Sequence, residues 1–136
     1  AFMALCPSQY RYLLAIYELT QQHNSIRCVD VANHLSVTRP SVSKMMKCMV
    51  NSGLVEPDYC KNITLTKMGL HLAQEYSANH AMIYAFFHRM LKLPPEEAQA
   101  QTMLFLSTFP LETSKKLTHV MEKSIIAAKS KAAKSI

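Results

Sequence analysis

The sequence has two glycines and no tryptophan among its 136 residues. It also lacks any run near the ~20 apolar residues that a membrane-spanning helix needs. We find no glycine loop that could cradle a phosphate, no Ser-His-Asp arrangement and no HExxH motif. The first residues, AFMALCPSQ, are too few and lack the basic flank of a secretory signal. These absences predict a cytoplasmic protein that is not an enzyme and does not span a membrane.

Paired cysteines are absent too. Cys6, Cys28, Cys48 and Cys60 lie 22, 20 and 12 residues apart, which is neither the C-x-x-C spacing of a zinc site nor the density of a disulfide scaffold. We expect reduced thiols. One alternative stays open: Cys48 follows Lys47, so its oxidation could disturb whatever that segment binds.

Acidic residues are in the minority. Fifteen Lys and Arg residues face nine Asp and Glu residues, which gives a net charge of +6 and a pI near 9.2. A basic chain favours an acidic partner, either nucleic acid or an anionic membrane surface. Almost half of the residues are apolar, enough to build a core.

The spacing of the apolar residues predicts a mainly helical chain. A first helix is expected from an N-cap at Ser8 to about Gln22, with Tyr10, Leu13, Leu14 and Tyr17 on its buried face. A short helix follows near residues 29–35. Another is capped by Thr38, carries Val42, Met45 and Met49 on its apolar side, and ends at Gly53 in a left-handed conformation.

Beyond this point the sequence predicts a hairpin and three more helices. Residues 54–56 and 62–65 are expected to be extended and joined by a polar tip. Thr66 is expected to cap a long helix to about Leu91, with Leu72, Tyr76, Ile83, Phe87 and Met90 on one side. The LPPEE segment at 93–97 predicts a restart with proline at the entry and carboxylates in the first turn. That helix should end before Phe109, and a last helix should fray in the basic tail at 129–136.

The segment from Cys28 to Met45 has the pattern of a helix-turn-helix. Two short helices that cross steeply need apolar inner faces and a small residue where they meet. Ala32 is that small residue, Val37 fills the turn, and the remaining apolar positions are Val31, Leu35, Val42 and Met45.

The outward side chains of the second helix predict what it binds. From Arg39 to Lys47 this helix carries donors and positive charge without an acidic residue. In such motifs this end of the helix enters the major groove of DNA. Arg39 could fork to a guanine edge, whereas lysines more commonly contact phosphates. The predicted DNA-binding residues are Thr38, Arg39, Pro40, Ser41, Ser43, Lys44 and Lys47, with Lys61 from the hairpin tip, where Tyr59 and Asn62 also lie.

The runs YLLAIYEL, VDVANHLSVTRPSVSKMMKCMVNSGLV and ITLTKMG resemble the metal-dependent repressors of the diphtheria toxin repressor and manganese transport regulator type. The similarity covers about residues 8–92 well and the later helices more loosely. It implies a winged helix-turn-helix domain with a small β-hairpin wing, followed by an all-helical dimerisation domain. It also implies a homodimer that represses transcription from a palindromic operator on double-stranded DNA.

The resemblance fails at the metal site. Family members use manganese or iron. The positions that correspond to their ligands are occupied by Arg11, Leu14, His80, Ala100, Met103 and Leu104. Only His80 retains a family ligand, and a guanidinium at position 11 repels a divalent cation. The sequence therefore predicts no metal cofactor, and Arg11 could replace the cation in joining the two domains.

We expect the DNA-binding domain at residues 1–70 and the dimerisation domain at 71–136. Two alternatives stay open. One is a winged helix that binds protein instead of DNA. The other is a regulator that responds to redox state, to a small molecule, or to a soft metal through Met103 and His80.

Overall fold

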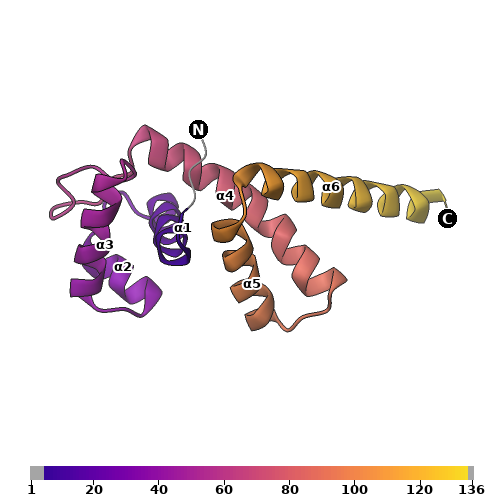
Figure 1. The fold of residues 1–136 in the computed structure, drawn as a ribbon, viewed down its shortest axis with the longest axis horizontal. Coiled ribbons are helices and arrows are strands. Elements are labelled where there is room, and N and C mark those ends of the chain that lie inside the picture. The colour runs from indigo at the N-terminus through magenta and orange to yellow at the C-terminus, as the bar shows by residue number, and fades with distance from the viewer. Residues whose placement is uncertain (1–4, 135–136) are drawn as a thin grey trace. The chain divides into compact units, whose positions relative to one another are not determined.

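The structure is a computed structural model that describes residues 5–134 (Figure 1). Its helices are α1 (Pro7–Gln22), α2 (Cys28–Leu35), α3 (Arg39–Asn51), α4 (Lys67–Ala85), the π-helical turn η1 (Phe86–Met90), α5 (Pro95–Thr108) and α6 (Leu111–Lys134). The predicted mainly helical fold is confirmed. The chain divides inside α4 into a first unit, Leu5–Ser77, and a second unit that starts at Ala78. None of the helices within residues 5–134 is long and apolar enough to cross a bilayer.

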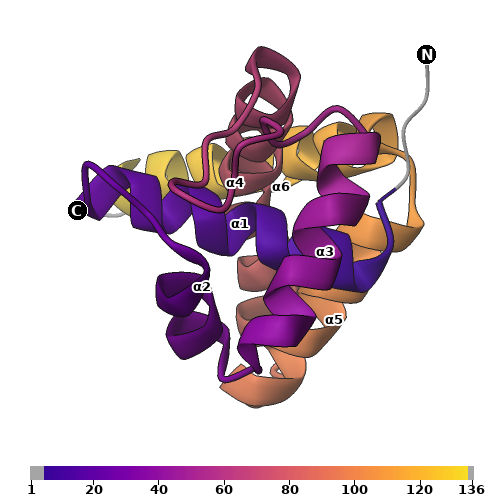
Figure 2. The same cartoon turned by 90° about the vertical axis from the view of Figure 1, so that its left-hand side faces the viewer.

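The core of the first unit lies where α1, α2 and α3 contact one another (Figure 2). Burial of each large apolar side chain there contributes roughly 1.5–3 kcal/mol. The side chains that are almost fully buried come from the three helices and from the segments that flank them: Tyr10, Leu13, Ile16, Ile26, Val31, Val42, Met46, Met49, Leu54 and Ile63.

Two details of the predicted helices are wrong. α1 begins at Pro7 with Cys6 as its N-cap, not at Ser8, because Pro7 has no amide hydrogen to leave unpaired and the Gln9 side chain accepts from the Cys6 N–H at 3.2 Å. In α3 the central buried residue is Met46, whereas Met45 is half-buried. The spacing Val42, Met46, Met49 is the i, i+4, i+7 pattern of one helix face, and it was available in the sequence.

The predicted helix-turn-helix is present. Ser36 ends α2 in the left-handed conformation (φ 56°), and the Val37 N–H donates to Ala32 O at 3.0 Å. Thr38 then caps α3, because its side-chain oxygen accepts from the Ser41 N–H at 3.3 Å, and Pro40 lies in the first turn. These contacts close one helix and open the next within three residues.

The predicted hairpin is reduced to a single antiparallel bridge between Val55 and Leu65, extended by a bond from the Glu56 N–H to Thr64 O at 2.9 Å. Gly53 has the predicted left-handed conformation (φ 76°). Thr66 caps α4 as predicted, with its hydroxyl oxygen accepting from the Gly69 N–H at 3.0 Å. A Cβ on Gly69 would lie 2.1 Å from Leu54 O, so only glycine permits this approach.

The second unit differs from its prediction at both ends. α4 ends at Ala85, not near Leu91, because the backbone widens into η1, where the Leu91 N–H donates to Phe86 O at 3.0 Å. Met90, expected on the buried side, is exposed. α5 starts at Pro95 and stops before Phe109 as predicted. The sequence predicted a frayed tail from Lys129, which is wrong for residues 129–134 because α6 remains helical to Lys134. Residues 135–136 of the predicted tail lie outside the described residues.

Candidate nucleic-acid interface

The basic side chains of α3 are presented by a helix whose other side is buried. Val42, Met46 and Met49 are 0% exposed. Arg39, Lys44 and Lys47 are exposed, and we call these three residues the basic face. Because the apolar side is fixed in the core, the basic face cannot rotate inward. Within residues 5–134 none of the three forms an ion pair, so their charge is available to a ligand.

The start of α3 adds polar groups beside the basic face. The Thr38 and Ser41 hydroxyls lie 2.8 Å apart, and both residues are exposed together with Pro40. Ser43 is half-buried, so it is less open than the sequence pattern predicted. The first turn of a helix also directs unpaired N–H groups and the positive end of the helix dipole outward. An anion is therefore favoured here.

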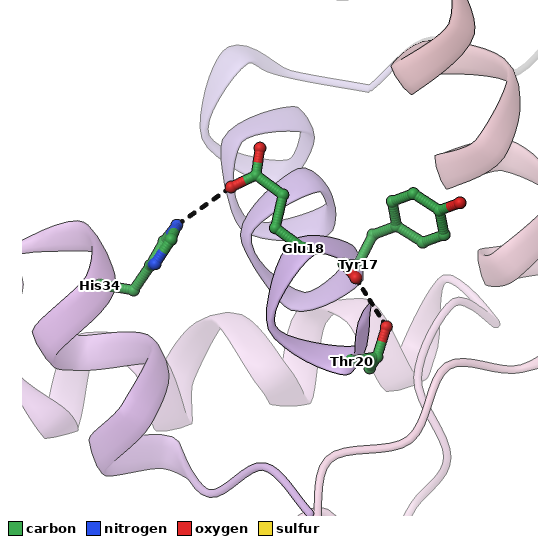
Figure 3. A network of polar contacts seen from close by, with 4 residues as sticks. All are labelled: Tyr17, Glu18, Thr20 and His34. Carbon is green, nitrogen blue, oxygen red and sulfur yellow. Dashed lines mark hydrogen bonds and ion pairs between the residues drawn. The ribbon is translucent and has the colours of Figure 1, made fainter. Parts of the chain in front are cut away.

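Two polar contacts join α2 to α1. They bear on the position of α3, because α3 packs against α2. His34 Nε2 lies 3.2 Å from Glu18 Oε2, and in Figure 3 these side chains extend toward each other from α2 and α1. The Arg11 Nη2 group donates to Leu35 O at 2.8 Å. That carbonyl lies in the last turn of α2, where the helix leaves acceptors unpaired and a cation is favourable.

The tip between residues 57 and 62 divides into exposed and structural residues. Lys61 is exposed and Tyr59 is half-buried. Asn62 is engaged inside the protein, because its Oδ1 accepts from the Ile26 N–H at 2.8 Å and from the Ser25 hydroxyl at 3.1 Å. The sequence placed Asn62 beside the tip without indicating this bond, since a single asparagine carries no spacing signal.

The positions that correspond to the family's metal ligands do not form a donor set for manganese or iron. Arg11 carries a cation, and its contact with Leu35 O lies inside the first unit, which is not the role between domains that the sequence suggested. Leu14, Ala100 and Leu104 have no donor atom, which leaves an imidazole at His80 and a thioether at Met103. Manganese and iron prefer carboxylate and imidazole ligands, and a thioether suits softer metals. Among the described residues no group of three or more His, Cys, Asp or Glu side chains could hold an ion.

Three rings form a ladder on the second unit near His80. The rings of His80 and Tyr84 are 6.4 Å apart, and those of Tyr84 and His88 are 5.3 Å apart. His88 Nδ1 donates to Leu93 O at 2.9 Å, which fixes the orientation of its ring. The ladder therefore stabilises the end of α4 and the turn that follows it.

The arrangement of α1, α2 and α3 is a helix-turn-helix domain, and comparison with known proteins shows which proteins it resembles. Residues 4–61 match the model of the iron dependent repressor N-terminal DNA binding domain. The transcriptional regulator MntR of Escherichia coli O157:H7 is 34% identical over 88 residues, covering 65% of this chain and 56% of MntR. For MntR of Salmonella typhimurium the identity is 32%, covering 65% and 55%.

Solved structures of similar fold include further transcriptional regulators. The metal-dependent transcriptional regulator MtsR matches with a TM-score of 0.72 and 26% identity over 85% of this chain and 54% of that chain. The manganese regulator SloR matches with the same TM-score and identity over 88% and 54%. A hypothetical protein from Sulfolobus solfataricus, 19% identical, shares the fold.

Residues 4–61 therefore match an iron dependent repressor DNA-binding domain, and the chain is similar to metal-dependent regulators, in line with the resemblance that the sequence showed. The matched domain model is that of a repressor, and the curated relatives are transcriptional regulators. The chain spans about half the length of the curated relatives and solved structures that it matches.

Proposed function

We propose that this protein is a sequence-specific DNA-binding transcriptional regulator, a repressor that acts in the cytoplasm. The observation that carries the proposal is the basic face of α3, exposed in front of the buried Val42, Met46 and Met49 within a domain of the iron dependent repressor family. α3 enters the major groove as the recognition helix. Its N-terminal half, Thr38 to Lys47, contacts DNA.

The residues of this half have different roles. Arg39 reads a guanine through its two parallel N–H donors. Lys44 and Lys47 contact phosphates, and Thr38, Ser41 and the N-terminus of α3 donate to phosphate oxygens. Pro40 and Ser43 shape the surface between these contacts. The turn at residues 57–62 acts as the wing, from which Lys61 reaches a neighbouring phosphate.

The operator is a palindrome bound by a homodimer, with the two α3 helices one DNA turn apart. The helical dimerisation domain, expected from the sequence at residues 71–136, supplies the dimer contact. An apolar groove of about 470 Å³ on α5 supports this role. It is lined by Phe87, Gln101, Leu104, Phe105, Thr108 and Phe109. Leu104 and Phe109 are 53% and 47% exposed, which is costly for a surface that stays in water.

The regulator binds its operator without manganese or iron. In place of a cation, Arg11 supplies a fixed positive charge that joins α1 to the end of α2 through Leu35 O. This contact keeps the recognition helix in position whether or not metal is present. A repressor built this way responds to an input other than the supply of those metals.

The test is selection of bound duplexes from a random DNA pool, with and without a metal chelator. We expect one palindromic sequence to be enriched equally in both arms. If no sequence is enriched, the protein is not a sequence-specific DNA-binding regulator. If enrichment occurs only without chelator, DNA binding is real and the metal-independent part of the proposal is wrong.

Variants of α3 assign the contacts. Arg39→Ala should relax the base preference at one position of each half-site, at a cost of about 1–3 kcal/mol. Lys47→Ala should weaken binding to all DNA sequences by the same factor. It should also lower the slope of log affinity against log salt concentration by the amount that about one phosphate contact contributes. Lys116→Ala, which removes an exposed lysine of α6, is the matched control and should leave binding unchanged. Unaltered affinity in both α3 variants contradicts the assignment of α3 as the recognition helix.

A further inference from the structure

Two cysteines from distant parts of the sequence lie on segments of the first unit that are hydrogen-bonded to each other. Cys28 is the first residue of α2, and Cys60 lies in the turn at the wing position. The segments that carry them are bonded together two and three residues away, since the Ile63 N–H donates to Ile26 O at 2.7 Å. The Asn62 side chain adds a second tie to the Ile26 N–H at 2.8 Å.

The two thiols differ in environment. Cys60 is exposed, whereas Cys28 is half-buried, and both are free thiols. Burial raises the pKa of the Cys28 thiol above its ordinary value, and the electrostatic effect of the nearby Cys60 raises it further. A thiol in this state stays protonated at neutral pH and is a poor first nucleophile toward an oxidant. Cys60 is therefore the thiol that an oxidant meets first.

We propose that Cys28 and Cys60 form a redox-sensitive dithiol, a modification site that a hydroperoxide converts to a disulfide. The Cys60 thiolate attacks one peroxide oxygen, which breaks the O–O bond and gives a sulfenic acid at Cys60. With hydrogen peroxide as oxidant, the leaving hydroxide takes up a proton as water. Cys28 sulfur then attacks the Cys60 sulfur, loses its proton and expels a second water. Two thiols and one hydrogen peroxide thus give one disulfide and two waters.

The other two cysteines serve as an internal comparison. Gln9 lies between them, since its Nε2 donates to Cys48 Sγ at 3.4 Å and its Oε1 accepts from the Cys6 N–H at 3.2 Å. A bond between Cys6 and Cys48 would require the Gln9 Nε2 group to leave Cys48 Sγ.

The experiment treats the full chain with hydrogen peroxide at low protein concentration and then blocks the remaining thiols. Intact mass and non-reducing peptide mapping then locate the bond. We expect a mass loss of about 2 Da, the two thiol hydrogens, in single chains that carry no interchain disulfide, and a single cross-linked pair of peptides that contains Cys28 and Cys60. The loss should reverse with dithiothreitol. It should persist in the Cys6→Ser/Cys48→Ser double variant and disappear in Cys60→Ser.

A local readout tests the position of the bond. Trypsin cleaves after Lys61, which is exposed in the same turn. We expect oxidation to slow this cleavage in the wild type and not in Cys60→Ser. A bond between any other pair, or thiols that stay reduced or over-oxidise singly, overturns the proposal. The mass measurement needs no DNA, so this failure is distinct from a failure of the proposed regulator function.

Discussion

The two units of the chain differ in how completely each buries its apolar side chains. Among residues 5–134, eight large apolar side chains are strongly exposed, and the first unit, Leu5–Ser77, contains two of them, Met68 and Leu70. The other six are in the second unit: Met90, Leu91, Leu104, Phe109, Val120 and Ile126. α6 also buries only Ser114 and Met121 along its 24 residues. The first unit thus has a core of its own, whereas the second leaves apolar side chains exposed, which the proposed dimer would cover.

The most damaging change should be truncation in the core of the first unit. Met46→Ala removes a fully buried side chain between α3 and its neighbours and should lower the free energy of unfolding by about 2–5 kcal/mol. The adjacent Met45→Ala is the control, because Met45 is half-buried, and it should cost less than about 1 kcal/mol. Urea denaturation followed by circular dichroism measures both. Equal losses would show that the core is not where the structure puts it.

Substitutions in the α5 groove of the second unit should weaken self-association of the chain and leave its folding unchanged. In the double variant Leu104→Lys/Phe109→Lys, two charges replace apolar groups of the α5 groove, which should weaken self-association by about 100-fold. Sedimentation velocity gives the dissociation constant, and circular dichroism should show the helices intact.

Gln99→Lys is the matched control for this change, since it adds one charge on α5 at an exposed residue outside the groove. It should leave association unaltered. The proposed role of the groove would be contradicted if the wild type were a monomer. It would also be contradicted if the double variant formed dimers as strongly as the wild type.

The smallest effect should come from a polar atom inside the first unit. The Tyr10 hydroxyl is buried with no hydrogen-bond partner among residues 5–134, and its ring packs 5.0 Å from that of Tyr76. Tyr10→Phe removes only this unpaired group, so it should be neutral or stabilise by up to about 1 kcal/mol. Thermal unfolding at neutral pH measures the change, and a clear loss of stability would mean that the hydroxyl has a partner, such as a bound water.

Wild-type Tyr10 gives the stability a pH dependence that the Tyr10→Phe variant removes. Burial first, and the neighbouring Tyr76 second, raise the pKa of Tyr10 above its ordinary value. The folded state therefore keeps the proton that the unfolded chain releases near pH 10. The stabilisation from Tyr10 is complete below that pH and is lost as the pH rises above it. Tyr10→Phe should lose less stability than the wild type between about pH 10 and 11, the start of that range.

The sequence predicted the parts of this protein that depend on local chemistry. Thr38 and Thr66 as caps, Gly53 as a left-handed residue and Pro95 as a helix start follow from the residues themselves. The helix-turn-helix was equally visible because its apolar spacing is short-range. The exposed position of Arg39, Lys44 and Lys47 follows from the same periodicity.

What escaped prediction depends on contacts between distant segments. The donation from Arg11 to Leu35 O joins residues 24 apart, and that from Ile26 to Asn62 joins residues 36 apart. The widening of the backbone at Phe86 has no marker in the sequence, because the apolar residues that surround it fit an ordinary α-helix as well.

The close approach of Gly69 to Leu54 O has a consequence for how the first unit moves. The Leu54 carbonyl also accepts from the Thr66 N–H, so one oxygen serves the base of the 55–65 turn and the first turn of α4 together. If either lost its structure, the other would lose a packing partner in the same event. We therefore expect the backbone amides of these two turns to become open to solvent exchange as one cooperative segment.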